Sequence, residues 1–404
     1  MSTLLQINTS VNRGSTGRIA EQIAEKAIDR GWDCYTAYSN IANPSKTHLY
    51  RISNKFTVYR HGFYSRLFDT AGLGSIKATQ KFISFIDEIK PDIVHLHNIH
   101  GYVLNYKILF EYLNKQNIPV VWTFHDFWAI TGHCCHFISA NCTKWQIECN
   151  HCPKTRGYPT SYFDFSRRNF LLKKELFTKS NLHVVAVSKW VEKLTHLSFL
   201  KNKDIRCIEN GVDIESFKPL TYKGYSIPDD KYVIMGVASQ WNASKGLQDY
   251  CCLSEKLSDD EIIVLVGLNV KQIKQLPKNI IGIKRTESVD ELARLYSRAD
   301  VITSLSYGET FGLTIIEGYA CGTPAVVYDN TALPQLINEK LGHVVPTGNI
   351  RALYETLQEM KASSFKKHHS SDCIQYARNH FDKDKCFNMY VDLYEELVKE
   401  KFMI

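Results

Sequence analysis

The stretch SYGETFGLTIIEGYACGTPAVV, residues 306–327, decides the fold of this chain. It connects two short apolar runs, DVITSLS (300–306) and PAVVYD (324–329), whose length and content are typical of buried strands. Between them, Gly308 and Gly312 allow a tight turn, and LTIIEGYACG is apolar enough for a buried helix. A strand, a glycine turn, a helix and a second strand predict one parallel βαβ unit, with Ser306 as the last residue of the first strand.

The same alternation of strands and helices is predicted in both halves of the chain. In the first half we expect a helix over Thr16–Arg30, because Ile19, Ile23 and Ala27 recur on one face and Gly31 can end it. The first half has strand-like runs at residues 4–10, 33–39, 92–97, 119–126 and 181–188, and the second half at 231–239, 261–267 and 279–284. The polar stretch 213–230 is typical of a linker.

We therefore predict two Rossmann-like, doubly wound α/β domains that face each other across a cleft. Ligands would bind where the strands end. The expected boundaries are 1–215 for the first domain, with a cysteine-rich insertion at 133–153, and 216–382 for the second domain. Residues 383–404 should form a helix that packs back toward the first domain.

The composition is that of a folded protein: 404 residues, 44% hydrophobic and 23% charged. The sequence contains no apolar run of 18 residues, and the opening MSTLLQINTS lacks the features of a signal peptide. We therefore expect a cytoplasmic chain, in which the twelve cysteines are reduced thiols or metal ligands rather than disulfides.

Basic residues are concentrated in the first half, where residues 1–217 contain 27 Lys and Arg against 18 Asp and Glu; the remainder has 22 against 24. This excess suits an anionic membrane surface or a phosphate-bearing acceptor, although it could equally solvate an ordinary surface. The segment 56–68, FTVYRHGFYSRLF, could lie at an interface, or it could be a buried helix and loop. The basic residues are dispersed and not interleaved with aromatics, so we expect no nucleic-acid binding.

The start of the apolar helix is a candidate phosphate site. There the peptide N–H groups of Phe311, Gly312 and Leu313, with the hydroxyl of Thr314, would face an anion at the positive end of the helix dipole. Glu317 lies one turn further on, and a carboxylate can accept two sugar or ribose hydroxyls. The pattern predicts a site for a sugar diphosphate.

At this point several motifs, in this order, resemble those of one family. They are GSTGRIAEQIA (14–24), HLHNIHGYVLN (95–105), WTFHDFWAITGHC (122–134), IENGVDIESFKP (208–219), GVASQWNASKGL (236–247) and the pair Glu309-x7-Glu317. Together they resemble the retaining glycosyltransferases of GT-B architecture in glycosyltransferase family 4, specifically bacterial transferases of the colanic-acid and O-antigen type. The resemblance covers nearly the whole chain.

The resemblance implies roles for individual residues. Glu309 would lie near the hydroxyls and the reacting face of the donor sugar, and Glu317 would bind the ribose of the nucleotide. Lys245 would neutralise the diphosphate as it leaves, and His125 corresponds to an active-site histidine.

The resemblance also implies a role for two glycines, and the sequence differs from the family pattern at one position. Gly14 and Gly17 would keep side chains away from donor and acceptor. An arginine often stands five residues before the lysine in the family, but here that residue is Gln240. Either Arg285 or Arg18 supplies the second cation, or this protein uses one cation fewer.

The expected function is therefore retaining transfer of a hexose from a UDP- or GDP-sugar to a lipid-diphosphate-linked glycan acceptor. The reaction would need no catalytic metal. The protein would work in the cytoplasm, either free or peripheral at the inner face of the cell membrane, in surface polysaccharide assembly. Two alternatives stay open: a nucleotide-sugar epimerase of the same architecture, and a non-catalytic protein that binds sugar nucleotides.

Three histidines and five cysteines suggest metal chemistry. His95 and His97 lie on one strand face, with His100 close behind, and these three could serve a metal, the fold or the acceptor site. Cys149-x-x-Cys152 has the spacing with which two thiolates share one tetrahedral zinc ion.

The resemblance supplies the second pair of that site, Cys134 and Cys142, although Cys135 or a histidine could replace one of them. We expect a structural zinc ion that holds the insertion, with a disulfide or a reduced buried cluster as the alternatives.

Overall fold

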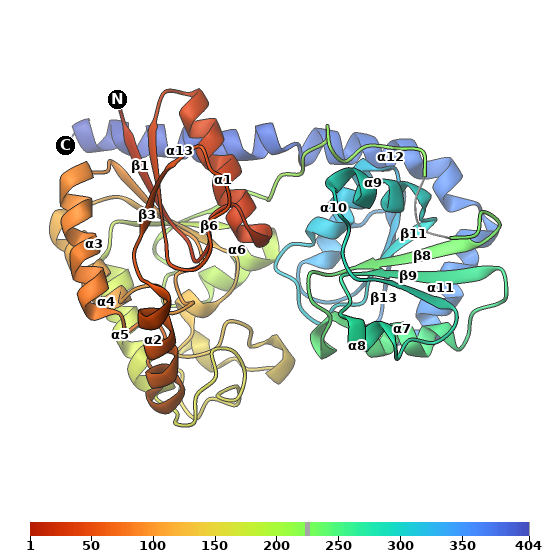
Figure 1. Cartoon of the computed structure of the whole chain (residues 1–404), viewed down its shortest axis with the longest axis horizontal. Helices are drawn as coiled ribbons and strands as arrows, with labels where there is room; N and C mark the ends of the chain where they lie inside the picture. Colours follow the sequence, from red (N-terminus) through yellow and green to blue (C-terminus); the bar gives the residue numbers. More distant parts are fainter. Residues whose placement is uncertain (223–226, 404) are drawn as a thin grey trace. The chain divides into compact units, whose positions relative to one another are not determined.

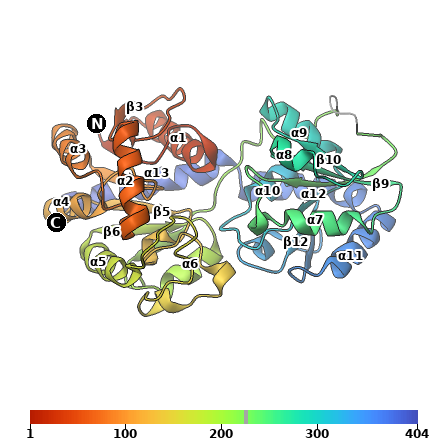
Figure 2. The ribbon, with the colours of Figure 1, turned by 60° about the horizontal axis from the view of Figure 1, so that its bottom comes forward.

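The computed structural model describes residues 1–222 and 227–403. Within them the chain forms two compact units: residues 1–209 together with the chain from Cys386 onward, and residues 210–385. Each unit is one parallel sheet flanked by helices (Figures 1 and 2). The observed division falls at residues 209 and 386, where the expected boundaries were 215 and 383.

The first unit contains a parallel seven-stranded sheet in the order β3-β2-β1-β4-β5-β6-β7. Its strands are β1 (Thr3–Ile7), β2 (Asp33–Tyr38), β3 (His48–Arg51), β4 (Ile93–Leu96), β5 (Val120–Phe124), β6 (Leu182–Ala186) and β7 (Asp204–Cys207). The strand order reverses between β1 and β4, which pair directly, and this is where a doubly wound sheet opens a crevice at its carboxyl edge.

The helices of this unit are α1 (Gly14–Asp29), α2 (Lys55–Phe68), α3 (Ile76–Ile89), α4 (Tyr106–Gln116), α5 (Ser166–Lys179), α6 (Lys189–His196) and α13 (Lys383–Met403). The predicted first helix is confirmed, and Ile19, Ile23 and Ala27 are its buried face. Between β5 and α5 the chain has only three single-turn 3₁₀ helices among the described residues: η1 (Trp128–Ile130), η2 (Ile138–Ala140) and η3 (Lys144–Gln146).

The last helix, α13, belongs to the core of the first unit. Phe387, Tyr390 and Tyr394 are buried in it. The Tyr394 hydroxyl lies 2.6 Å from Nδ1 of His95 on β4, and the ring of Tyr394 contacts Trp32 edge-on at 5.7 Å. The first unit is therefore assembled from both ends of the chain.

In the second unit, the described residues form a parallel six-stranded sheet in the order β10-β9-β8-β11-β12-β13. The strands are β8 (Tyr232–Val237), β9 (Glu261–Val266), β10 (Ile280–Ile283), β11 (Val301–Ser304), β12 (Ala325–Tyr328) and β13 (Gly342–Val345). The helices are α7 (Leu247–Ser254), α8 (Val270–Ile273), α9 (Val289–Arg298), α10 (Leu313–Ala320), α11 (Ile350–Ala362) and α12 (Phe365–His380), with 3₁₀ turns η4 (Ala243–Lys245) and η5 (Leu333–Leu336).

The βαβ unit expected over 300–329 is present as β11, α10 and β12, and the two strands pair in parallel, with Ile302 opposite Ala325. The strand ends at Ser304, so the prediction that Ser306 ends it was wrong by two residues. Ser306 has already left the sheet, because its hydroxyl bonds the carbonyl of Ser244 in the neighbouring loop at 3.1 Å.

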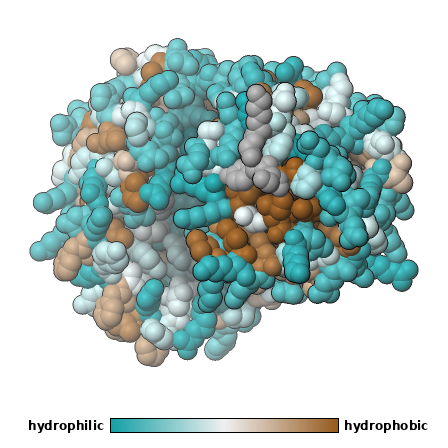
Figure 3. All heavy atoms as spheres, turned by 45° about the vertical axis from the view of Figure 1, so that its right-hand side comes forward, coloured by the Kyte–Doolittle hydropathy of each residue, from teal (hydrophilic) through white to brown (hydrophobic). Residues whose placement is uncertain are grey.

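No helix in the described part of the chain is both long and apolar enough to cross a bilayer. The face in Figure 3 is mostly hydrophilic, with one extended apolar patch right of centre and smaller apolar groups scattered over the rest.

Candidate active site

The second sheet reverses its order between β8 and β11, which pair directly, with Val301 opposite Ile234. From β8 the sheet continues through β9 on one side, and from β11 through β12 on the other. Ligands of open α/β sheets bind outside the carboxyl ends of such strands. Here the two segments at that position are η4, which carries Lys245, and the loop that carries Glu309.

Lys245 and Glu309 form an ion pair across this crevice, with Nζ of the lysine against Oε1 of the glutamate. Two further contacts hold the loops in place. The N–H of Tyr307 donates to the carbonyl of Ser244 at 2.8 Å, and the N–H of Glu309 donates to Oγ1 of Thr331 at 3.0 Å. The structure thus brings together two residues that are 64 positions apart in sequence.

Gly246 lets the two loops approach this closely. Its φ is +71°, which disfavours residues with a side chain, and an added Cβ would lie 2.1 Å from the carbonyl oxygen of Leu305. The backbone of Gly246 therefore lies directly against the end of β11, and Lys245 is the residue before it.

Helix α10 begins at Leu313, and Gly312, with φ +116°, is its N-cap. The first turn thus starts later than expected, and Phe311 lies in the loop before it. The ring of Phe311 is buried and 5.7 Å from that of Phe381. The first N–H groups of a helix have no carbonyl partner within it, so Leu313 and Thr314 present the donors that an anion would use.

Glu317 is half-buried on α10 and accepts a hydrogen bond of 2.8 Å from the hydroxyl of Tyr296 on α9. Burial, followed by the nearby Glu317 carboxylate, raises the pKa of Tyr296 well above its ordinary value. Tyr296 therefore stays a hydrogen-bond donor at any working pH. Sequence reasoning missed this residue, because a tyrosine in an amphipathic helix looks like an ordinary core position.

The structure does not bring Arg285 to the lysine. Arg285 is exposed after β10, the edge strand, and β9 separates β10 from β8. Arg18 is exposed on α1 in the first unit. The second cation stays unassigned.

In the first unit, His97 follows β4 and His125 follows β5. Nδ1 of His97 lies 3.2 Å from Nε2 of His125, and Nε2 of His97 lies 2.8 Å from Oε1 of Gln6. Gln6 is oriented by its own amide N–H₂, which donates to the carbonyl of Ala20 at 2.8 Å. Because Oε1 of Gln6 can only accept, His97 carries its proton on Nε2, and its Nδ1 accepts from Nε2–H of His125.

This chain of hydrogen bonds places the lone pair of neutral His125 on Nδ1. Burial lowers the pKa of His125 to about 4, against the opposing charge of Asp126. Burial also holds the pKa of His97 well below its ordinary value. Both rings are therefore neutral at pH 7, and His125 can act as a hydrogen-bonding group rather than as a cation. The contact between Gln6 and His97 was not predicted: His97 stands in the motif HLHNIHGYVLN (95–105), but only a metal, fold or acceptor-site role was expected of it, and Gln6 stands in no motif.

The three histidines of residues 95–100 do not share one site. His95 bonds Thr123 at 2.8 Å and Tyr394 at 2.6 Å, so it joins β4 to β5 and α13. His100 bonds Asp126, with Nε2 and Oδ2 2.7 Å apart. Although burial acts the other way, His100 holds the pKa of Asp126 well below its ordinary value.

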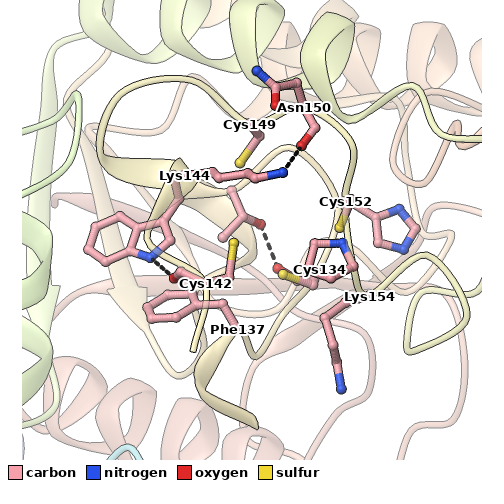
Figure 4. A pocket seen from close by; sticks show the side chains of 12 residues that line it. Cys134, Phe137, Cys142, Lys144, Cys149, Asn150, Cys152 and Lys154 are labelled. Atoms are coloured by element: carbon pink, nitrogen blue, oxygen red, sulfur yellow. Dashed lines mark hydrogen bonds between the residues drawn. The ribbon is translucent and has the colours of Figure 1, made fainter. Parts of the chain in front are cut away.

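Among the described residues, His100, Asp126 and Cys135 form a group whose possible ligand atoms all lie within 4.8 Å of one another. The four cysteines expected to bind zinc line a different cavity nearby. Cys134, Cys142, Cys149 and Cys152 all border it (Figure 4).

The two remaining glycines lie at the start of α1. Gly14 opens the helix with φ +69°. Gly17 is buried, and a Cβ there would lie 3.1 Å from the carbonyl oxygen of Ser10, in the loop that follows β1. Both positions adjoin the crevice at the end of β1.

Two doubly wound domains in one chain, with a lysine and an E-x7-E element at the crevice of the second, define a glycosyltransferase of the GT-B class. Comparison with known proteins agrees. The chain superposes on sucrose-phosphate synthase from Thermosynechococcus elongatus with a TM-score of 0.74 and 16% identity, over 99% of this chain and 100% of that one. It superposes on HepE from Anabaena in complex with UDP-glucose with a TM-score of 0.66 and 15% identity, over 98% and 100%.

One family model matches most of each half of the chain. The Glycosyltransferase Family 4 model matches residues 16–216, and the Glycosyl transferases group 1 model matches residues 227–380. This protein belongs to glycosyltransferase family 4.

Two proteins with similar sequences come from bacteria. A protein of Escherichia coli K12 named as a colanic acid biosynthesis glycosyl transferase is 22% identical over 52% of this chain, and the match spans 55% of that protein, about half its length. An uncharacterised protein from the cps region of Klebsiella pneumoniae is 21% identical over 81% of this chain and 86% of its own.

Proposed function

We propose that this protein is a retaining glycosyltransferase that moves a hexose from a UDP- or GDP-sugar to a lipid-diphosphate-linked glycan in bacterial surface polysaccharide assembly. The observation that carries the proposal is the contact of Lys245 with Glu309 beside the start of α10. The names of the relatives support the process: colanic acid biosynthesis for one, and the cps region for the other.

The second domain would hold the donor. Cleavage of the bond between sugar and diphosphate leaves negative charge on the departing oxygens, which Lys245 and the N–H groups of Leu313 and Thr314 would stabilise. Glu309 keeps the lysine ammonium at the crevice and would accept hydroxyls of the donor sugar. Glu317, held by Tyr296, would accept the ribose hydroxyls.

The first domain would bind the acceptor. His125 is neutral at pH 7, so it would contact the acceptor as a hydrogen-bonding group rather than bind a phosphate as a cation. The hydroxyl would attack the face of the sugar from which the diphosphate leaves. The new bond replaces the broken one on the same face, and the departing diphosphate takes the acceptor proton.

A lipid-linked acceptor requires the protein to reach a membrane, and α2 is suited to that. Phe56, Tyr59 and Phe63 on this helix are 72%, 77% and 60% exposed, whereas His61 and Ser65 form its buried side. The alternative that this segment is a buried helix and loop was therefore wrong. Arg60 and Arg66 are also exposed on α2.

The aromatic surface continues onto a neighbouring loop. The N–H of Tyr162 donates to the carbonyl of Arg66 at 2.7 Å, so the loop lies against the end of α2. Tyr158, Tyr162 and Phe163 on that loop are exposed as well. Aromatic side chains mixed with arginines are typical of a surface that binds anionic lipid headgroups. We propose an anionic bilayer as the partner of this surface.

The donor is best identified by incubating the protein with UDP- and GDP-sugars and measuring thermal stabilisation and release of the nucleoside diphosphate. Stabilisation by one donor, followed by glycosylation of a lipid-diphosphate glycan with the anomeric configuration kept, is expected. An epimerised free sugar nucleotide would instead establish an epimerase. Binding without nucleotide release, with lipid-linked glycans supplied, would indicate a non-catalytic protein.

A further inference from the structure

The long insertion that follows β5 needs something to hold it. Between Phe124 and Ser166 the only helices or strands of this fully described segment are three single-turn 3₁₀ helices. Loops of this length without regular structure are uncommon in compact domains, and an internal crosslink is one way to fix them. Residues 134–152 contain five of the twelve cysteines of the chain.

Four of these cysteines surround one small cavity. Cys134, Cys142, Cys149 and Cys152 line it, and the stacked rings of Phe137 and Trp145, with centroids 4.7 Å apart, form its apolar wall. The volume is about 10 Å³, near the least that lets a cavity hold one water-sized occupant. Figure 4 shows the four sulfur atoms turned toward this common space.

The surrounding backbone is already bonded in a way that leaves the thiols facing the cavity. The indole N–H of Trp145 donates to the carbonyl of Cys142 at 2.9 Å, and the hydroxyl of Thr131 donates to the carbonyl of Cys134 at 2.5 Å. The sulfur of Cys149 accepts the N–H of Gly132 at 3.3 Å. Such N–H donors to sulfur orient the ligands of metal–thiolate centres.

Two basic side chains lie buried beside the cavity. The ammonium of Lys173 donates to the carbonyls of Trp128 at 2.6 Å and Thr131 at 3.0 Å, and it lies 3.4 Å from the centre of the Trp128 ring. His133 borders the cavity, and its Nδ1 is 2.5 Å from Asp69. Its Nε2 is buried and has no hydrogen-bond partner.

Buried positive charge is costly unless negative charge lies near it. Asp69 supplies one carboxylate here, bonded to Nδ1 of His133, and four neutral thiols would add no further negative charge. Four thiolates around one Zn²⁺ carry a net charge of −2, which would offset the ammonium of Lys173 and give Nε2 of His133 a sulfur to bond.

We propose that Cys134, Cys142, Cys149 and Cys152 bind one Zn²⁺ ion that fixes the insertion. Binding releases the thiol protons and forms four Zn–S bonds of about 2.3 Å, which draws the sulfurs closer than they lie now. Four protein ligands leave no open position, so the ion is structural. Cys149 and Cys152 supply the tight two-residue spacing, and Cys134 and Cys142 complete the tetrahedron.

The test is zinc content and ligand identity in untagged protein purified with a reductant. We expect about one zinc per chain and an X-ray absorption spectrum with four sulfur neighbours. Cys142→Ser and Cys149→Ser should each lower bound zinc at least tenfold, whereas Cys252→Ser, a matched control on α7 in the second domain, should keep it.

Several results would overturn the site. Wild-type protein that contains no zinc would overturn it. Nitrogen and oxygen neighbours of the zinc in the X-ray absorption spectrum would also overturn it, and would point to His100, Asp126 and Cys135 instead. A disulfide found by alkylation and mass spectrometry of the reductant-purified protein would also exclude it. The wild-type measurements stand even if a serine variant does not fold. None of these results depends on transferase activity.

Discussion

Lys245 and Glu309 are bonded across the carboxyl edge of the second sheet, one following β8 and the other following β11. The pair holds a cation at the place where a diphosphate would leave. We therefore expect Lys245→Ala and Glu309→Gln each to lower turnover at least about tenfold, or roughly 1.4 kcal/mol of transition-state stabilisation. Lys271→Ala, an exposed lysine on α8, is the control. Near-normal turnover in either folded variant would contradict the assignment.

Tyr296 should act through Glu317. Replacing it with phenylalanine keeps the buried ring but removes the hydrogen bond, which contributes about 1 kcal/mol. We expect Tyr296→Phe to raise KM for the donor about fivefold with kcat nearly unchanged, and Glu317→Gln to do the same more strongly. The two effects should not add in the double variant, because one interaction is removed in both. Additive effects would mean that the tyrosine does not position the carboxylate.

Gly246 offers a test of how tightly the two loops are joined. A positive φ alone costs an L-residue roughly 1–2 kcal/mol. Gly246→Ala should destabilise the second domain by more than this, because the new Cβ also meets the Leu305 carbonyl. Gly31→Ala is the matched control, since its φ is +84° but nothing lies within 4 Å of the added Cβ. Chemical denaturation measures both. Equal losses would show that the loops separate freely.

His61 predicts how stability depends on pH. Its Nε2 accepts the N–H of Gly74 at 2.9 Å, so the ring is neutral in the folded state, and burial lowers its pKa to about 4. In the unfolded chain the pKa of His61 is about 6.5. Below that pH the unfolded state therefore binds more protons than the folded state. Stability should fall as the pH drops from about 6.5 toward 4, by about 1 kcal/mol from this residue at pH 5.5. Denaturation at pH 7.5 and 5.5 should show a weaker dependence in His61→Gln; an unchanged dependence would contradict this.

The exposed aromatics of α2 predict membrane binding. Tyr59→Ser combined with Phe63→Ser should reduce flotation with anionic liposomes several-fold at low salt, while Val270→Ser, which removes an exposed apolar residue from α8, should not. Wild-type protein that does not float with anionic vesicles would exclude the bilayer as partner.

The sequence was sufficient for the buried strands of both sheets and for the turn before α10, because both depend on local patterns. Buried parallel strands such as β5 and β9 are continuous apolar runs, and the turn before α10 needs its glycines where they stand. Short, partly exposed strands were missed: β3 has no buried residue and β7 none either, so neither has an apolar run.

The rest of the site depends on residues far apart in the chain. Gln6 meets His97 across 91 residues, and nothing near either of them indicates the contact. The tautomer of His125 follows only from that contact. The exposure of α2 was likewise undecided, since its alternation of aromatic and basic residues fits either a buried or an exposed helix until His61 is seen to fill the inner side.

Helix α13 has a consequence for how the protein is made. The tyrosines of α13 complete the core of the first domain, whose other residues end at Glu209. While the second domain is being synthesised, the core of the first domain therefore lacks these side chains. The first domain gains these tyrosines only after residues 210–385 have been synthesised. A truncation that removes α13 would therefore damage the interior of the first domain, which is built mainly from residues 1–209.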